Sequence, residues 1–290
     1  MMHDDELPID EPLVRGLLTR QYPAWSGLPL TRVESGGTVN AMFRLGDGMA
    51  VRLPLTERWG GDVLHEERWL QRLAPEVPVR IPTVLGLGVA DATYPSPWLV
   101  VDWIPGAPPL PGSVADTSPL AEDLAQFLTA LRRIDTEGAP PGYRSGPVRD
   151  LDGGVGHCMT QFDDLLDTRG LAGMWAETLS ADDWNQAPVW AHCDLLGGNV
   201  LVENGRLCGV IDFGAAGIGD PACDLMAAWS ILPAAGRDRL RALIGVDDST
   251  WLRGRGWALS QAVIALPYYR VTNPTMVAAS LHTLAELLGR

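Results

Sequence analysis

Residues 190–212 contain three polar side chains at a spacing that suits metal-assisted phosphoryl transfer. Asp194 is followed five residues later by Asn199, and Asp212 ends an apolar run directly before Phe213-Gly214. In this chemistry one carboxylate accepts the proton of the attacking hydroxyl, while an amide and a second carboxylate hold Mg²⁺ on the nucleotide phosphates. A single Asp at position 194 would suggest only a turn cap. The three residues together predict Asp194 as the catalytic base and Asn199 and Asp212 as Mg²⁺ ligands.

In the form His-Cys-Asp, then Asn, then Ile-Asp-Phe-Gly, this segment resembles the catalytic loop and metal-binding segment of the protein-kinase-like fold. It is more similar to the aminoglycoside phosphotransferase and choline kinase family than to the protein kinases. The run from Gly219-Asp220-Pro221 to Leu225 resembles the family's GDPxxDL element, whereas Cys193 stands where Gly is usual. The resemblance implies an α+β, two-lobed structure, with a five-stranded antiparallel small lobe and a mainly helical large lobe.

The resemblance also implies a nucleotide site in the small lobe. Arg52 stands where the family has a phosphate-binding Lys, and all 22 basic residues of this chain are Arg. Arg can still contact phosphates and pair with a carboxylate, although an exposed Arg on an edge strand is the alternative interpretation. We expect Glu66 to be its partner in preference to Glu67, because Glu66 lies three residues before the apolar Trp69.

Two further segments are expected to contact ATP or GTP. The turn predicted to cover the phosphates consists of Ser35, Gly36, Gly37 and Thr38. Asp102 and Ile104 follow the fifth predicted strand, where the family binds adenine through backbone groups. The chain has no GxxxxGK[ST] motif, which excludes a P-loop kinase.

Apolar spacing predicts the elements that position these residues. Helices are predicted over 11–21, 58–73, 120–134, 162–171 and 179–184, and strands over 30–35, 41–45, 49–53, 84–89 and 98–103. Asn204-Gly205 lies between two apolar runs and predicts a hairpin that brings Asn199 close to Asp212. The Pro- and Gly-rich residues 104–112 predict a hinge. We therefore expect an N-terminal nucleotide-binding lobe over 1–103 and a C-terminal catalytic and substrate-binding lobe over 113–290.

The acceptor is expected to be the hydroxyl of a small molecule. Asp220 comes eight residues after Asp212, which leaves little room for the activation segment of a protein kinase. The resemblance implies an antibiotic kinase that confers resistance, first of all to an aminoglycoside. A macrolide, a cyclic-peptide antibiotic and a small alcohol stay open, as does a pseudokinase-like nucleotide-binding protein. The acidic candidates for binding a cationic acceptor are Asp163, Asp164, Asp167 and Glu286, although a solvated helix face explains each equally well.

The composition limits which partners and which cellular compartment we expect for the protein. A net charge of −14 argues against a nucleic acid, and the larger acidic excess falls on residues 104–290, which would suit a cationic substrate. The polar N-terminus and the lack of a long apolar run predict a cytoplasmic protein that does not enter the membrane. The four cysteines show no CxxC pair, so we expect reduced thiols and no zinc site.

Overall fold

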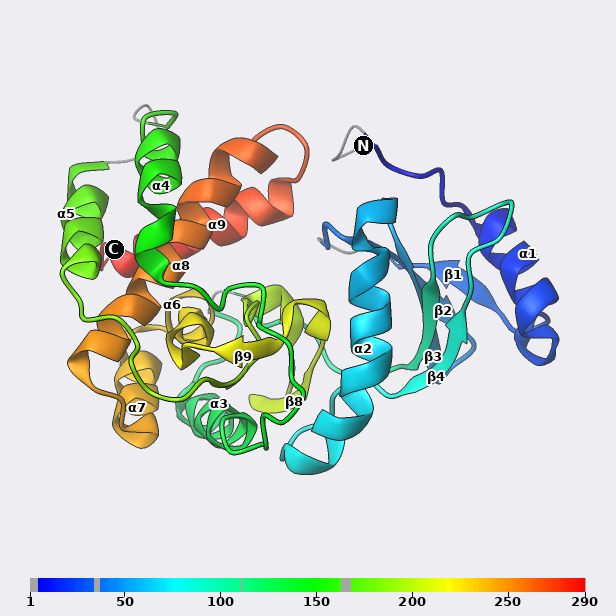
Figure 1. Ribbon diagram of the computed structural model, residues 1–290, viewed down its shortest axis with the longest axis horizontal. Coiled ribbons are helices and arrows are strands. Elements are labelled where there is room, and N and C mark those ends of the chain that lie inside the picture. Colours follow the sequence, from blue (N-terminus) through cyan, green and yellow to red (C-terminus); the bar gives the residue numbers. More distant parts are fainter. Residues whose placement is uncertain (1–4, 34–36, 111, 163–167, 290) are drawn as a thin grey trace.

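The computed structural model describes residues 5–33, 37–110, 112–162 and 168–289, which form two lobes (Figure 1). The helices are α1 (Glu11–Gln21), α2 (Gly60–Leu73), α3 (Ser118–Leu131), α4 (Asp152–Met159), α5 (Thr168–Leu179), α6 (Ala227–Ser230), α7 (Ala234–Ile244), α8 (Asp248–Tyr269) and α9 (Pro274–Leu287). The strands are β1 (Leu30–Arg32), β2 (Asn40–Leu45), β3 (Met49–Pro54), β4 (Val84–Gly88), β5 (Trp98–Asp102), β6 (Val189–Ala191), β7 (Val200–Glu203), β8 (Arg206–Val210) and β9 (Gly217–Gly219). Short 3-10 helices are η1 (Pro23–Trp25), η2 (Glu57–Trp59), η3 (Ala74–Glu76), η4 (Val148–Leu151), η5 (Gly197–Asn199), η6 (Phe213–Ala215) and η7 (Pro221–Met226).

The small lobe is an antiparallel five-stranded sheet in the order β1-β2-β3-β5-β4, with α1 and α2 on opposite faces. Side chains alternate between the two faces along a strand. Val51 of β3 therefore belongs to the same apolar cluster as Leu17 of α1, while Ala50 packs in the cluster that contains Val63 of α2. Arg52 lies two residues after Ala50, so its side chain is directed to the α2 face.

The large lobe is mainly helical and contains the largest apolar core. Leu124 and Leu128 of α3 and Leu259 and Val263 of α8 are fully buried in it. Two short antiparallel strand pairs, β6–β9 and β7–β8, lie among these helices. In Figure 1, β8 and β9 are on the side of the large lobe nearest α2. This arrangement brings the segment between Asp194 and Asp212 to the boundary between the lobes.

The predicted α+β class and the five-stranded antiparallel sheet are confirmed. The helices predicted over 11–21, 58–73 and 120–134 correspond to α1, α2 and α3. The helix predicted over 179–184 is wrong, because α5 ends at Leu179 and a loop follows. Helix α4 was missed because its sequence, DGGVGHCM, contains three glycines, which disfavour a helix. It forms nevertheless because Val155 and Met159, one turn apart, are both buried.

The segment that joins the lobes packs on the β7–β8 hairpin. Ala107 and Val202 exchange two backbone hydrogen bonds, of 3.2 and 2.8 Å. The lobe boundaries themselves, 1–103, 104–112 and 113–290, stay a prediction. Within the described residues, no helix combines the length and the apolar character needed to cross a membrane.

Candidate active site

The β7–β8 hairpin places Asn199 beside Asp212. Val200 is paired with Val210, and one step further the Ile211 amide donates to the Asn199 carbonyl oxygen at 2.9 Å. At the other end of the hairpin, Asn204 and Gly205 both have positive φ, as a two-residue type I′ turn requires. The turn closes the hairpin, and a register shift of one residue between Leu201 and Val202 follows it. In the resulting register the two residues predicted as metal ligands lie at the open end of the hairpin.

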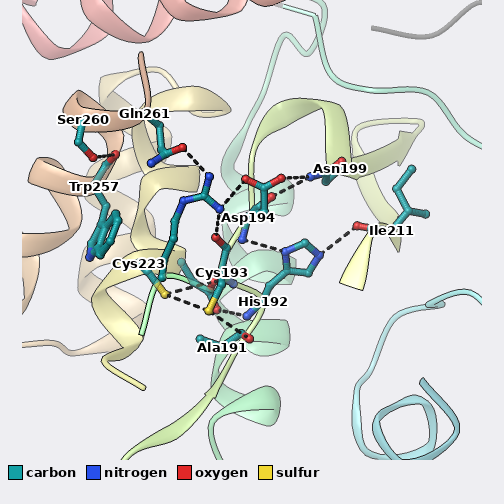
Figure 2. Close-up of polar contacts among 12 residues, drawn as sticks. Ala191, His192, Cys193, Asp194, Asn199, Ile211, Cys223, Trp257, Ser260 and Gln261 are labelled. Atoms are coloured by element: carbon teal, nitrogen blue, oxygen red, sulfur yellow. Dashed lines mark hydrogen bonds and ion pairs between the residues drawn. The ribbon is translucent and has the colours of Figure 1, made fainter. Parts of the chain in front are cut away.

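Asn199 also holds the predicted catalytic base (Figure 2). Its Nδ2 donates to Asp194 Oδ2 at 3.0 Å and to the Asp194 carbonyl oxygen at 2.8 Å. The amide nitrogen is thereby used toward Asp194, so the amide oxygen of Asn199 remains the atom suited to a cation. A single short loop therefore positions both a carboxylate that can accept a proton and an oxygen that can bind a metal.

Arg52 is the centre of a buried charge cluster. Its Nη1 contacts both carboxylate oxygens of Glu66, at 2.8 and 2.6 Å, and its Nη2 lies 3.1 Å from Asp212 Oδ1. Glu66 Oε1 also accepts a hydrogen bond from the Phe213 amide at 2.7 Å. Burial acts to lower the pKa of Arg52, but Glu66 and Asp212 outweigh it and raise that pKa. The guanidinium is therefore held charged beside Asp212, and the expected pairing with Glu66 is present.

The donor chemistry fits Mg²⁺. Asn199 and Asp212 offer an amide oxygen and a carboxylate, which are hard ligands, and Mg²⁺ in such sites takes its remaining ligands from substrate phosphates and water. Within the described ranges, no group of three or more His, Cys, Asp or Glu side chains could hold a metal ion. The four cysteines are free thiols.

The carboxylate of Asp224, in η7, holds the catalytic loop in place. This carboxylate is 1% exposed and accepts the amide hydrogens of His192 and Cys193 at 2.9 and 2.8 Å. Burial raises its pKa, although the hydrogen bonds from the two amides oppose that rise. His192 Nδ1 accepts from the Asp194 amide at 3.3 Å, so Nε2 is the atom that donates to the Ile211 carbonyl oxygen at 3.0 Å. His192 thereby links the base to the hairpin, and its role is structural.

Cys193 adopts the left-handed backbone conformation, with a φ of 64°. This conformation costs a non-glycine residue about 1–2 kcal/mol, a cost that a glycine at this position would avoid. The Cys193 side chain is fully buried, and its Sγ lies 3.8 Å from that of Cys223. The thiol is therefore a packing group beside the base.

Asp220 and Arg253 fix the segment that follows the metal site. Asp220 Oδ1 accepts from the Ala222 amide at 2.9 Å and caps η7, as the Asp-Pro sequence predicts. The same carboxylate forms two hydrogen bonds with Arg253 of α8, at 2.7 and 3.2 Å, and both side chains are buried. The GDPxxDL element thus ties the active-site loops to the core helix α8.

Of the residues predicted to bind the nucleotide, some are described by the structure and some are not. Ser35 and Gly36 lie outside the described residues, whereas Thr38 is described and forms a side-chain hydrogen bond with Tyr269 at the end of α8. Asp102 uses its carboxylate within the sheet, accepting from the Thr83 amide at 2.6 Å and pairing with Arg80 at 2.8 Å. Gly37 lies in the described loop before β2.

Ile104 is buried against β8. A Cβ added at Gly209 would lie 2.7 Å from Ile104 Cγ2, so this glycine makes room for the Ile104 side chain. The side chains of Asp102 and Ile104 are engaged in these contacts, and binding of a base through backbone groups near them stays a prediction.

Among the predicted acceptor residues, only Glu286 is described, because Asp163, Asp164 and Asp167 lie outside the described residues. Glu286 is on α9 and pairs with Arg237 of α7 at 3.1 Å. It lines a cavity of about 100 Å³ together with Leu110 and Ile231. The contacts known for the described residues do not join Glu286 to Asp194 or Asp212.

Four residues that lie near Asp194, Asp212 or their partners were not predicted from the sequence. They are Asp62, Arg144, Gln261 and Tyr269. Asp62 is four residues before Glu66 and so shares its helix face, a signal that the sequence does offer. Its pKa is raised to about 6, mainly by burial and then by the charges of Asp212 and Glu66. The other three come from a loop and from α8, far from the motif in sequence.

Replacing Asp62 by Asn is expected to stabilise the protein above about pH 6. In wild type, the folded pKa of Asp62 exceeds the ordinary value of about 4, so its contribution to stability is present below pH 4 and is lost as the pH rises through 6. Because the side chain is only partly buried, we expect a gain of about 1 kcal/mol at most. Urea unfolding at pH 4.5 and pH 8 measures it, with Asp238→Asn on α7 as the matched control. An equal effect of Asp62→Asn at both pH values would contradict the assignment.

The sequence is similar to those of known phosphotransferases. The model of the phosphotransferase enzyme family matches residues 30–257. The viomycin phosphotransferase of Streptomyces vinaceus is 31% identical over 202 residues, which are 64% of this chain and 70% of that protein.

Two solved structures illustrate the structural likeness. The GDP complex of wild-type aminoglycoside 2'-phosphotransferase-IIIa has a TM-score of 0.76 at 20% identity and covers 97% of this chain and 99% of its own. The macrolide 2'-phosphotransferase apoenzyme from Brachybacterium faecium has a TM-score of 0.62 at 22% identity, covering 97% and 98%. These likenesses confirm the predicted kinase-like fold.

Proposed function

Because the chain belongs to the phosphotransferase enzyme family, we propose that it transfers the γ-phosphoryl group of a nucleoside triphosphate to a hydroxyl group of an antibiotic. The family match confirms the resemblance seen in residues 190–225 and the prediction of an enzyme of the phosphotransferase class. The family match does not identify the phosphate donor, the metal, the acceptor or the role of each residue, so we propose these.

The observation that carries the proposal is the contact of Asp194 with Asn199 beside Asp212. In the proposed reaction, the acceptor hydroxyl donates its proton to Asp194 as its oxygen forms a bond to the γ-phosphorus. The bond between that phosphorus and the β,γ-bridging oxygen breaks, and the nucleoside diphosphate leaves. Asn199 and Asp212 would hold Mg²⁺, which lowers the charge of the phosphates when bound.

Arg52 is proposed to bind the phosphates in place of the family's Lys. Its guanidinium has the carboxylate partner on α2 and the contact to Asp212 that such a cation needs in order to stay beside the metal ligands. This geometry supports an active enzyme over a pseudokinase-like binding protein. Gly37 and Thr38 would cover the phosphates, and backbone groups of Asp102 and Ile104 would bind the base of ATP or GTP.

For the acceptor we propose a cyclic-peptide antibiotic of the viomycin type. The 31% identity to a viomycin phosphotransferase supports it, whereas the solved aminoglycoside and macrolide phosphotransferases resemble the chain in fold alone. An aminoglycoside is the second candidate, because the acidic excess of the chain would suit any polycationic acceptor. Phosphorylation would inactivate the antibiotic in the cytoplasm, where nucleoside triphosphates are available.

Residues 1–103 would then form the nucleotide-binding lobe, 104–112 the hinge, and 113–290 the lobe that carries the base and the acceptor site. The contact between Ala107 and Val202 supports this division, because it fixes the hinge against the catalytic hairpin. Asp163, Asp164, Asp167 and Glu286 stay candidates for binding a cationic acceptor.

A mass-spectrometric assay tests the proposal. The enzyme is incubated with Mg²⁺, ATP or GTP, and viomycin, kanamycin, a macrolide, choline or homoserine in turn. We expect viomycin to gain the mass of one phosphoryl group and Asp194→Ala to abolish the gain. Asp238→Ala, which removes an exposed carboxylate on α7, is the matched control. Transfer to kanamycin alone would make an aminoglycoside the acceptor in place of a cyclic-peptide antibiotic. Transfer to none of the compounds would contradict the proposal.

A further inference from the structure

A charged side chain reaches the predicted base from outside the catalytic motif. Arg144 lies in the loop between α3 and η4, and its Nη1 is 3.0 Å from Asp194 Oδ1. The same nitrogen donates to the Cys193 carbonyl oxygen at 2.6 Å, and Nη2 donates to Gln261 Oε1 of α8 at 2.5 Å. Three acceptors from the catalytic loop and from α8 therefore surround one guanidinium.

Backbone hydrogen bonds, independent of this side chain, fix the loop that carries Arg144. The Gly142 amide donates to the Ile218 carbonyl oxygen at 3.1 Å, and the Tyr143 amide donates to the Ala215 carbonyl oxygen at 2.9 Å. Ile218 in turn donates to the Pro140 carbonyl oxygen at 2.9 Å. The loop is thus anchored on η6 and β9, the segment directly after Asp212. Removing the Arg144 side chain leaves all of these bonds in place.

The two ends of the Asp194 carboxylate are held by different partners. Oδ2 accepts from Asn199, a contact drawn in Figure 2, and Oδ1 pairs with Arg144, so the plane of the carboxylate is fixed. Each carboxylate oxygen has two lone-pair directions, and an acceptor hydroxyl can therefore still donate to Asp194. Charge-assisted hydrogen bonds are the strongest available in such a site, and they fix geometry as well as adding energy.

We propose that Arg144 is the positioning residue of the catalytic base, and that Gln261 holds Arg144 in place from α8. This assignment rests on the proposed function, since it concerns the base of that reaction. Transfer requires the acceptor oxygen in line with the γ-phosphorus, and a misplacement of about 1 Å can cost about 100-fold in rate. The left-handed turn at Cys193 contributes to the same arrangement, because the carbonyl oxygen of that residue is the third acceptor of the guanidinium.

The test compares Arg144→Ala, Arg144→Lys and Gln261→Leu with Arg149→Ala, the matched control. Arg149 precedes α4, is exposed, and pairs with Asp183, so the control removes an arginine of equal charge away from the base. The readouts are kcat, KM for nucleotide and acceptor, nucleotide Kd and Tm. We expect Arg144→Ala to lower kcat by about 100-fold with nucleotide Kd and Tm close to wild type. Arg144→Lys should recover part of kcat, because an ammonium keeps the contact with the carboxylate.

Gln261→Leu is expected to lower kcat less than Arg144→Ala, because Asp194 and Cys193 still hold the guanidinium. The assignment is overturned if Arg144→Ala keeps kcat within twofold of wild type. It is overturned as well if kcat, nucleotide affinity and Tm fall together without recovery in the Lys variant. If both wild type and Arg144→Ala transfer phosphate at the normal rate, the positioning role is contradicted but the proposed function is not. Inactive wild-type protein contradicts the proposed function and this role together.

Discussion

Replacing Asp194 by Ala is expected to lower kcat by about 1,000-fold while the nucleotide Kd stays within a few-fold of wild type. A positioned general base contributes about 10²–10⁴-fold, and Asp194 is the carboxylate that Asn199 and Arg144 hold in place. The phosphate contacts proposed for Arg52 do not depend on it. Steady-state kinetics with the best acceptor and nucleotide titration of the unreacted variant measure the two quantities.

Asp194→Asn separates the role in proton transfer from that in holding the loop. It keeps the shape of the side chain but cannot accept the proton in the same way, so we expect a loss of kcat similar to that of the Ala variant. Asp238→Ala, which changes an exposed carboxylate on α7, should leave kcat at the wild-type value. If Asp194→Asn retained wild-type kcat, Asp194 could not be the base.

Glu66→Ala is expected to lower the free energy of unfolding by about 3–5 kcal/mol, because it leaves a buried guanidinium without its main counter-charge. Arg52 and Glu66 are 6% and 1% exposed, so water cannot replace the lost carboxylate. The variant also removes the acceptor of the Phe213 amide, which holds the segment after Asp212. We therefore expect weaker nucleotide binding as well. Urea unfolding and nucleotide titration measure these effects.

Glu67→Ala is the matched control for that experiment. Glu67 is the neighbouring residue on α2 and was the alternative partner for Arg52 in the sequence. Since the guanidinium pairs with Glu66, the change at Glu67 should alter the free energy of unfolding by less than about 0.5 kcal/mol. Equal destabilisation by the two substitutions would contradict the buried ion pair.

The parts of the site that could be predicted are those fixed by short-range geometry. Asn199 and Asp212 lie at the open end of one hairpin that an Asn-Gly turn closes, and both the turn and the apolar runs are visible in the sequence. The register shift between Leu201 and Val202 is not visible there. Glu66 could be separated from Glu67 because only one of two adjacent helical positions faces the sheet beside Trp69. Asp62 could have been found in the same way, one turn earlier on that face.

Arg144 and Gln261 could not be predicted, because their contacts depend on how distant segments pack. Arg144 meets Cys193 across 49 positions and Gln261 across 117, and neither residue belongs to a motif. The loop of Arg144 is held near the base by backbone hydrogen bonds to Ala215 and Ile218, which no local sequence pattern signals. Helix α4 is missed for a related reason, because burial of two side chains overrides the low helix propensity of three glycines.

The dependence of phosphoryl transfer on Mg²⁺ concentration tests the central claim most directly, since that claim assigns Asn199 and Asp212 to the metal. Initial rates are measured for wild type and Asn199→Ala over a Mg²⁺ series, with a metal chelator as the zero point. The account predicts no transfer by wild type under chelator and a higher Mg²⁺ requirement for Asn199→Ala. Transfer that proceeds at the full rate under chelator, or an identical Mg²⁺ dependence in the two proteins, would contradict it.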